Sequence, residues 1–343
     1  MALPETGTMR GLWLEEFNKP YIYHTDLPIP QPGPGVLVLR VMAAGFCHTK
    51  TVAMVGDYKG VTLPVVPGHE NVGIVAAVGE GVTEFKIGDW VGTTTFCFSC
   101  SACNCDNCHK GISNYCNSVQ AAGFTMDGGM AKYMCCNLVW TVKLPHELSF
   151  KKAVPLMCAG STIYNLIYQA KQPKGLVIAI VGIGGLGQLG VQYAKALGYK
   201  AVAIDTWQSI LDYMNTLPNG LAPDLAINPQ EGAEAALEKI STRFEGAKGV
   251  SAAIVATDPL PAYDFATKIL AKHGVMVVVG LPKEPIPFCY SDIIFRDISI
   301  TSGTPFPKPL LQEMVQLTVE ANIVVDTVDT REFIPIFSNL NED

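Results

Sequence analysis

The second half of the chain alternates short, wholly apolar runs with segments of helical periodicity. Apolar runs without polar alternation are typical of strands buried on both faces of a parallel sheet. The periodic segments between them predict helices that cover such a sheet. Six strands are predicted, at 176–181, 201–204, 225–227, 250–256, 275–279 and 298–301. Helices are predicted at 186–197, 233–244, 262–271 and 308–321.

The first 150 residues have a different pattern, in which short β-rich runs such as 36–41 and 72–78 are separated by glycine and proline. Such punctuation is typical of strands joined by turns. Segment 27–35 has proline at nearly every second position, which excludes both a helix and a central strand. We therefore expect a domain of strands and turns, with an extended connection at 27–35.

A strand-to-helix junction in the second half carries glycines at G-x-G-x-x-G spacing, at Gly182, Gly184 and Gly187. The first permits a tight turn, the second lets the backbone approach a pyrophosphate, and the third lets the helix pack on the strand. The helix N-terminus offers free N–H groups and a positive dipole end. With six predicted strands, this junction indicates a Rossmann dinucleotide-binding domain.

An acidic residue, Asp205, follows the next predicted strand. A carboxylate at this place can accept hydrogen bonds from the adenosine ribose hydroxyls of a dinucleotide. It would repel a 2′-phosphate, and segment 206–209 supplies no arginine or lysine to offset the charge. The sequence therefore favours NAD(H) over NADP(H).

Composition narrows the class of protein. The 343 residues are 49% hydrophobic and 16% charged, which is enough apolar material for two cores. The formal net charge of −7 argues against a nucleic-acid partner. The start lacks a basic stretch followed by an apolar run, and we find no apolar stretch of the ~20 residues that a membrane span needs. We expect a cytoplasmic protein without a membrane partner.

Eleven cysteines in a reducing compartment point to metal or thiol chemistry. Cys47, His69 and Cys158 form one candidate set. Two thiolates and an imidazole suit zinc, and three protein ligands leave a fourth position open for water or substrate, as a catalytic zinc requires.

A second candidate metal site lies between 97 and 116, where six cysteines occur in repeated C-x-x-C pairs. Such pairs suit a closed four-sulfur zinc that stabilises a loop with little core of its own. Cys135, Cys136 and Cys289 stand in apolar surroundings, and we expect them in the core.

The stretch GHENVGIVAAVGEGV, at 68–82, resembles the zinc-containing alcohol dehydrogenase signature of the medium-chain dehydrogenase/reductase family at all its fixed positions. The resemblance covers almost the whole chain and is greatest to the yeast and fungal branch. Further matches lie at 45–49, 156–162, 182–187 and 278–280.

The resemblance implies a two-domain architecture and an oligomer. A β-rich, GroES-like catalytic domain would span 1–152 and be completed by about 303–343, with the Rossmann domain at 153–302. The family forms homodimers or homotetramers through edge strands of the cofactor domain, which would place the contact near Ile298.

The resemblance also implies the reaction, in which hydride passes between NAD(H) and a small alcohol or its aldehyde or ketone. Cys47, His69 and Cys158 would bind the catalytic zinc, and Glu70 would be the carboxylate that approaches the metal when its coordination changes. Thr49 would hydrogen-bond the substrate oxygen and relay its proton to the nicotinamide ribose. The dinucleotide would contact Gly182, Gly184, Gly185, Leu186, Gly187, Asp205 and Val279, and the apolar substrate wall is assigned to Met54, Tyr58 and Phe98.

For the second zinc, the family spacing C-x2-C-x2-C-x7-C places the last three ligands at Cys105, Cys108 and Cys116. The first position falls on Ala102. Cys103 is the closest substitute in sequence and is our first choice, with Cys100 as the alternative and His109 as a weaker one.

Two positions depart from the family. Lys50 stands where the resemblance calls for an aspartate that supports the histidine ligand, and loss of such a group typically weakens metal binding or activity about 10–100-fold. Val52 stands where many relatives have the histidine that ends the proton relay, so we expect a bias toward carbonyl reduction. These departures motivate two alternatives: a reductase of activated double bonds with weakened zinc use, and a non-catalytic nucleotide-binding protein.

Overall fold

The computed structural model describes residues 3, 7–57, 60–100, 105–218, 220–304 and 308–329, with the backbone alone at 50–52. The chain divides into two compact units. The first comprises 1–161, 305–315 and 325–343, and the second comprises 162–304 and 316–324.

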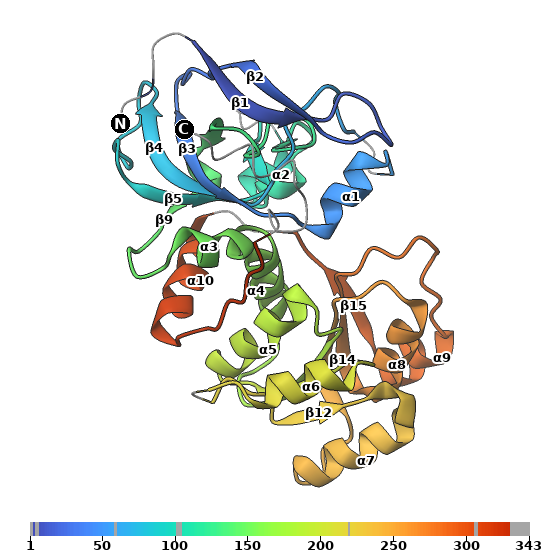
Figure 1. Ribbon diagram of the computed structural model, residues 1–343. Helices are drawn as coiled ribbons and strands as arrows, with labels where there is room; N and C mark the ends of the chain where they lie inside the picture. Colours follow the sequence, from blue (N-terminus) through green and yellow to red (C-terminus); the bar gives the residue numbers. More distant parts are fainter. Residues whose placement is uncertain are drawn as a thin grey trace. The chain divides into compact units, whose positions relative to one another are not determined.

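The first unit is built on a five-stranded antiparallel sheet of order β8-β3-β4-β5-β9 (Figure 1). Its strands are β3 (Val36–Ala44), β4 (Asn71–Val78), β5 (Trp90–Thr93), β8 (Tyr133–Asn137) and β9 (Thr141–Lys143). Two smaller antiparallel pairs are β1 (Thr8–Trp13) with β2 (Ile22–Pro28), and β6 (Phe96–Phe98) with β7 (Gln120–Ala121). The short helices are α1 (His48–Met54), α2 (Asp106–His109) and α3 (Phe150–Ala153).

Strand β3 contributes side chains to apolar clusters on both of its faces. Leu37 and Leu39 lie in one apolar cluster together with Val75, whereas Val38 lies in another with Leu12. This explains why β3 begins with four consecutive apolar residues, at 36–39. Residues 29–35 form neither helix nor strand, as the prolines predicted. Leu27 and Pro28 belong to β2, so the connection begins two residues later than expected.

The second unit contains a six-stranded parallel sheet of order β12-β11-β10-β13-β14-β15. The chain runs outward from β10 and then returns to β13, so the topological switch point lies between these two strands, where dinucleotides bind in such folds. The strands are β10 (Val177–Val181), β11 (Lys200–Ile204), β12 (Leu225–Ile227), β13 (Val250–Val255), β14 (Leu270–Val278) and β15 (Ser299–Ser302). The predicted fold class, a Rossmann domain with a β-rich domain, is confirmed.

Helices cover both faces of this sheet. The side chains of α7 and α8 form one apolar cluster with alternate residues of β10, among them Ala179. On the other face, Ile163 of α4 and Ile180 of β10 both lie against Gly190 of α5. The helices are α4 (Ala159–Gln169), α5 (Gly185–Ala196), α6 (Gln208–Asn215), α7 (Ala233–Arg243), α8 (Leu260–Ile269), α9 (Tyr290–Arg296) and α10 (Lys308–Glu320).

The division of the chain differs from the predicted one at both boundaries. The first falls inside α4, beyond the expected end at 152. After α10 begins in the first unit, residues 316–324 join the second, where Gln192 Nε2 donates to the Val324 carbonyl at 3.0 Å and Gln192 Oε1 accepts from Val324 N at 2.8 Å. This tertiary pairing has no signature in the local sequence pattern.

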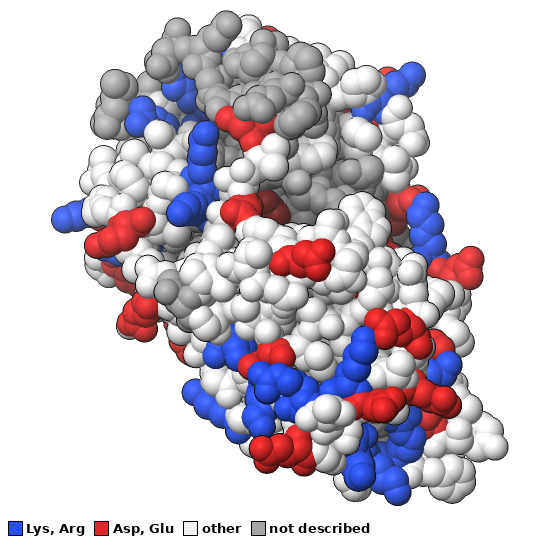
Figure 2. All heavy atoms as spheres, turned by 60° about the horizontal axis from the view of Figure 1, so that its bottom comes forward, with Lys and Arg blue, Asp and Glu red and all other residues white. Residues whose placement is uncertain are grey.

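Figure 2 shows basic and acidic side chains interspersed on the face that it presents, and the basic ones do not form a continuous single-sign surface there. Among the described residues, no helix is long and apolar enough to cross a membrane.

Candidate active site and metal centres

The first unit brings together the three ligands expected for a catalytic zinc, along with Glu70. One ligand atom from each of Cys47, His69, Glu70 and Cys158 lies within 4.8 Å of the others. Cys47 comes just before α1, His69 and Glu70 precede β4, and Cys158 precedes α4. Two loops beside the central sheet and the start of one helix therefore converge on one point.

The electrostatics of this cluster fit a divalent cation. The Cys47 and Cys158 sulfurs are 4.0 Å apart. A hydrogen bond from Cys158 lowers the pKa of Cys47 to about 3, despite burial, with further contributions from His69 and Thr49. The hydrogen bond with Cys47, together with burial, raises the pKa of Cys158. The two sulfurs therefore lie close enough for one cation to bind both, and a zinc ion would stabilise both as thiolates.

Thr49, the expected proton-relay residue, lies in α1, and its Oγ1 is 3.6 Å from the Cys47 sulfur. Met54, the last residue of the same helix, is half-buried. Phe98 of β6 packs against the core cluster around Cys97, so part of its surface is used inside the unit. Tyr58 lies outside the described residues.

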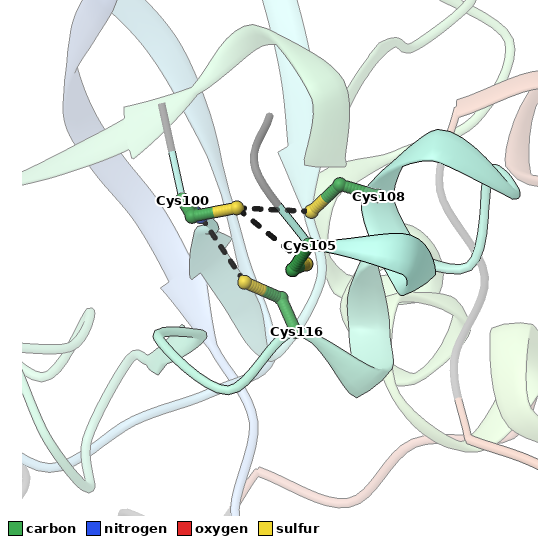
Figure 3. A group of neighbouring side chains, drawn as sticks. All are labelled: Cys100, Cys105, Cys108 and Cys116. Carbon is green, nitrogen blue, oxygen red and sulfur yellow. Dashed lines mark hydrogen bonds between the residues drawn. The ribbon is translucent and has the colours of Figure 1, made fainter. Parts of the chain in front are cut away.

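A second cluster contains four sulfurs. The ligand atoms of Cys100, Cys105, Cys108 and Cys116 all lie within 4.8 Å of one another, and Figure 3 shows the four side chains gathered around one point. The Cys100 sulfur is 3.5 Å from both the Cys105 and the Cys108 sulfur. Helix α2 carries Cys108, and a 3-10 turn at Ser113–Tyr115 leads into Cys116.

The environment of Cys116 favours a thiolate. Burial raises its pKa, but backbone N–H groups of Cys100, at 3.2 Å, and Ser118, at 3.4 Å, donate to its sulfur and bring the pKa to about 7. Four soft sulfur donors with no open position are typical of structural zinc. Cys100, the alternative first ligand, belongs to this cluster, whereas Cys103 lies outside the described residues.

The expectation for the remaining cysteines holds in part. Cys136 is fully buried and Cys135 is partly buried. The expectation for Cys289 is wrong: this residue is exposed just before α9, with its sulfur 3.0 Å from Ser291 Oγ. The apolar sequence around it forms an exposed helix surface rather than core.

The glycine loop between β10 and α5 has the geometry that pyrophosphate binding requires. A Cβ atom on Gly187 would lie 2.0 Å from the Gly182 carbonyl oxygen, so the helix can pack this closely only on glycine. At Gly184, by contrast, a Cβ would meet nothing within 4 Å. Open space therefore faces the backbone at the start of α5, where a phosphate can approach. Gly185 and Leu186 begin the helix beside it.

Asp205 follows β11 and is hydrogen-bonded to this glycine loop. Its Oδ2 accepts a hydrogen bond from Ile183 N at 2.7 Å, and its Oδ1 accepts one from Trp207 N at 2.9 Å. A cavity of about 440 Å³ extends from Asp205 and Gly182 to the start of α8. Val279, directly after β14, is half-buried and bonds to the end of β13 through its backbone N–H.

Several residues that line this cavity were not predicted from the sequence, among them Gln230, Thr257, Phe265 and Lys268. Gln230 and Thr257 lie in the loops that follow β12 and β13. The signal that could have located them is their position after the carboxyl ends of parallel strands, where ligands bind in such sheets.

Comparison with known proteins shows the family of the chain. Residues 33–146 match the model of the alcohol dehydrogenase GroES-like domain, and residues 185–322 match that of the zinc-binding dehydrogenase. An alcohol dehydrogenase of Geobacillus stearothermophilus is 36% identical over 92% of this chain and 90% of its own length. The chain belongs to the zinc-containing alcohol dehydrogenase family.

Other relatives of this dehydrogenase extend the comparison. An alcohol dehydrogenase of Rhizobium meliloti is 33% identical over 92% of this chain and 90% of its own. The solved structure of a cinnamyl alcohol dehydrogenase of Sorghum bicolor is 27% identical, covers 97% of this chain and 94% of its own, and superimposes with a TM-score of 0.81. These relatives are bacterial and plant proteins, and the yeast and fungal branch stays a prediction.

One feature distinguishes His69, the histidine expected to bind the catalytic zinc. His69 is only 1% exposed, and its Nδ1 has no hydrogen-bond partner among the described residues. Ligand histidines almost always donate their second ring N–H to a carboxylate or carbonyl. The orphaned nitrogen agrees with the sequence, which has Lys50 where the family pattern has an aspartate.

Proposed function

We propose that this protein is a zinc-dependent oxidoreductase that interconverts a small alcohol and its aldehyde or ketone with NAD(H). The observation that carries the proposal is the convergence of Cys47, His69 and Cys158 in a chain that also has a complete dinucleotide loop. Zinc, when bound, polarises the substrate oxygen as a Lewis acid. The membership of the zinc-containing alcohol dehydrogenase family supports the same conclusion.

The chain's own residues would hold the reactants and move one proton. Cys47, His69 and Cys158 would hold the zinc, and the Thr49 hydroxyl would accept the alcohol proton or return it to the carbonyl product. Glu70, 6% exposed beside the ligands, would offer a carboxylate when one ligand is displaced. This assignment makes Thr49 the group whose loss affects proton transfer without removing the metal.

The cofactor would be NAD(H) rather than NADP(H). Asp205 holds the turn after β11 through two backbone N–H groups, so its carboxylate is fixed beside the cavity. Ribose hydroxyls can donate to this carboxylate, whereas a 2′-phosphate would meet its negative charge.

We propose a second, structural zinc held by Cys100, Cys105, Cys108 and Cys116. Cys100→Ser should remove one zinc per chain and lower the melting temperature, because structural zinc contributes to folding directly. Cys103→Ser is the matched control because Cys103 is not one of the four ligands proposed, and it should leave the zinc content and the melting temperature unchanged. Elemental analysis measures the zinc content, and thermal unfolding measures the melting temperature. Loss of zinc in Cys103→Ser but not in Cys100→Ser would contradict the assignment.

We also propose a bias toward carbonyl reduction. With valine at 52, no histidine is present there to carry the alcohol proton to solvent, and general-base assistance is typically worth about 10²-fold or more. At pH 7, kcat for reduction of an aldehyde panel with NADH should exceed kcat for oxidation of the matching alcohols with NAD⁺. Val52→His should raise kcat for oxidation and leave reduction nearly unchanged. Equal kcat values in both directions for the wild type would contradict the bias.

The partners we propose are small alcohols and carbonyl compounds, a second copy of the chain in a homodimer or homotetramer, and no nucleic acid or membrane, in the cytoplasm. The expected contact near Ile298 would not use that side chain itself, which is 5% exposed inside the core of the second unit. Ile300 of β15 is 42% exposed, and β15 ends the described sheet. We place the contact there.

A further inference from the structure

The orientation of His69 requires an explanation, because no described residue makes the hydrogen bond that usually fixes a ligand histidine. Its ring is buried, and Nδ1 has no partner among the described residues. An imidazole anchored at one nitrogen alone can turn about its side-chain bonds. Metal affinity would then fall, since the ring would have to be ordered each time the ion binds.

An aromatic ring packs against this histidine. The ring centroids of His69 and Phe124 are 5.1 Å apart, with an angle of 35° between the ring planes. Phe124 is 2% exposed. A tilted ring at this distance restricts the rotation of its neighbour by close packing.

The same phenylalanine also contacts the helix that carries Thr49. Phe124 forms a small buried cluster with Ala121 and with Ala53 of α1, and Ala53 is 4% exposed. The ring therefore contacts both the metal ligand and the helix with the proposed proton-relay residue. A shift of Phe124 would therefore change the packing of both His69 and helix α1.

The loop that carries Phe124 is fixed to the segment just before His69. Val66 N donates to Asp127 Oδ1 at 2.8 Å, and Gly128 N donates to the Val66 carbonyl at 2.7 Å. Met130 N donates to the Pro67 carbonyl at 2.9 Å. These bonds join loop and ligand segment into one unit, so Phe124 cannot move away independently of His69.

We propose that Phe124 is the positioning residue of the catalytic metal site: it fixes the plane of the His69 imidazole by ring packing, in place of the absent carboxylate. The inference rests on the proposed catalytic zinc, and it assigns to an apolar residue a task that a hydrogen bond performs elsewhere. Zinc affinity should then depend on an aromatic ring at position 124.

The test compares variants with and without that ring. Phe124→Leu and Phe124→Met remove it, and methionine keeps most of the volume, so that at least the milder change preserves the fold. Phe124→Tyr retains the ring. The matched control is Phe85→Leu, because Phe85 is also buried, at 5% exposed, in a different cluster of the same unit.

The readout is zinc affinity, measured by competition with a chelator, and the visible absorption of the cobalt-substituted protein, which reports ligand geometry. We expect Phe124→Leu and Phe124→Met to weaken zinc binding at Cys47, His69 and Cys158 about 10-fold and to change the cobalt spectrum. This zinc is called the more labile one below. Phe124→Tyr and Phe85→Leu should keep wild-type affinity and spectrum, whatever their effect on melting temperature.

Some outcomes would contradict the inference on Phe124, and one would contradict the proposed function itself. If the ringless variants bind the labile zinc as tightly as the wild type does, with an unchanged cobalt spectrum, Phe124 is only a core residue and the inference fails. Equal weakening in Phe85→Leu has the same meaning. If the wild type itself binds only the four-sulfur zinc, the proposed function fails instead.

Discussion

His69→Ala should lower kcat for NADH-dependent aldehyde reduction by at least about 10³-fold. The variant lacks one of three zinc ligands, and Lewis-acid stabilisation of the reacting oxygen is worth several kcal/mol, with each ~1.4 kcal/mol equal to a factor of ten. Zinc should fall from two ions per chain to one, because the four-sulfur site is separate. Steady-state kinetics and elemental analysis of the same preparation measure both.

The control for this variant is His146→Ala. His146 is exposed and packs edge-on against Trp90, with ring centroids 4.6 Å apart, outside both metal clusters. It should retain two zinc ions and wild-type turnover. NADH should bind His69→Ala with unchanged affinity, since the dinucleotide loop belongs to the second unit. Turnover retained in a His69→Ala preparation with one zinc would contradict the role of this residue.

Asp205→Ala should weaken NADH binding about 10–100-fold and shift the preference between the cofactors toward NADPH. The carboxylate accepts two backbone hydrogen bonds that hold the loop, and bonds to a charged group are worth about 1.5–3 kcal/mol each. The ribose hydroxyls would lose their acceptor, and the repulsion of a 2′-phosphate would disappear. Fluorescence titration with NADH and NADPH measures the two affinities.

Asp212→Ala is the matched control for that prediction. Asp212 lies on α6, the next helix, and hydrogen-bonds Gln208 at 2.8 Å on the surface. Loss of the Asp212 carboxylate should change neither the NADH affinity nor the NADPH affinity. If Asp205→Ala bound NADPH no better relative to NADH than the wild type does, the assignment of cofactor preference to this carboxylate would be wrong.

The parallel sheet could be predicted from the sequence because most of its strands contain a short apolar run next to a helical segment, although β15 (Ser299–Ser302) is largely polar and exposed. Helices α6 and α9 were not predicted. Both are shorter than the window over which a helical periodicity can be recognised, although Leu211 and Met214 of α6 are buried. The allocation of 316–324 to the second unit depends on Gln192 and Val324, which lie far apart in sequence. Local patterns contain no information on such contacts.

The metal sites were predictable to different degrees. The catalytic trio is spread over the sequence, so only the family resemblance could join Cys47, His69 and Cys158. Fixed spacing could not choose the first ligand of the second zinc, because the stretch between Cys100 and Cys105 is longer than the two-residue spacer of the pattern. The packing of Phe124 on His69 could not be predicted, since nothing in the sequence distinguishes this phenylalanine from other core phenylalanines.

The central claim is that turnover requires a zinc ion at Cys47, His69 and Cys158. The most direct measurement is a titration in which a chelator removes the more labile zinc from wild-type protein and zinc is then added back, with kcat and zinc per chain recorded at each step. We predict two ions per chain at the start, loss of turnover as the count falls to one, and recovery in proportion to the zinc returned. Full turnover in protein with one zinc or none would contradict the account.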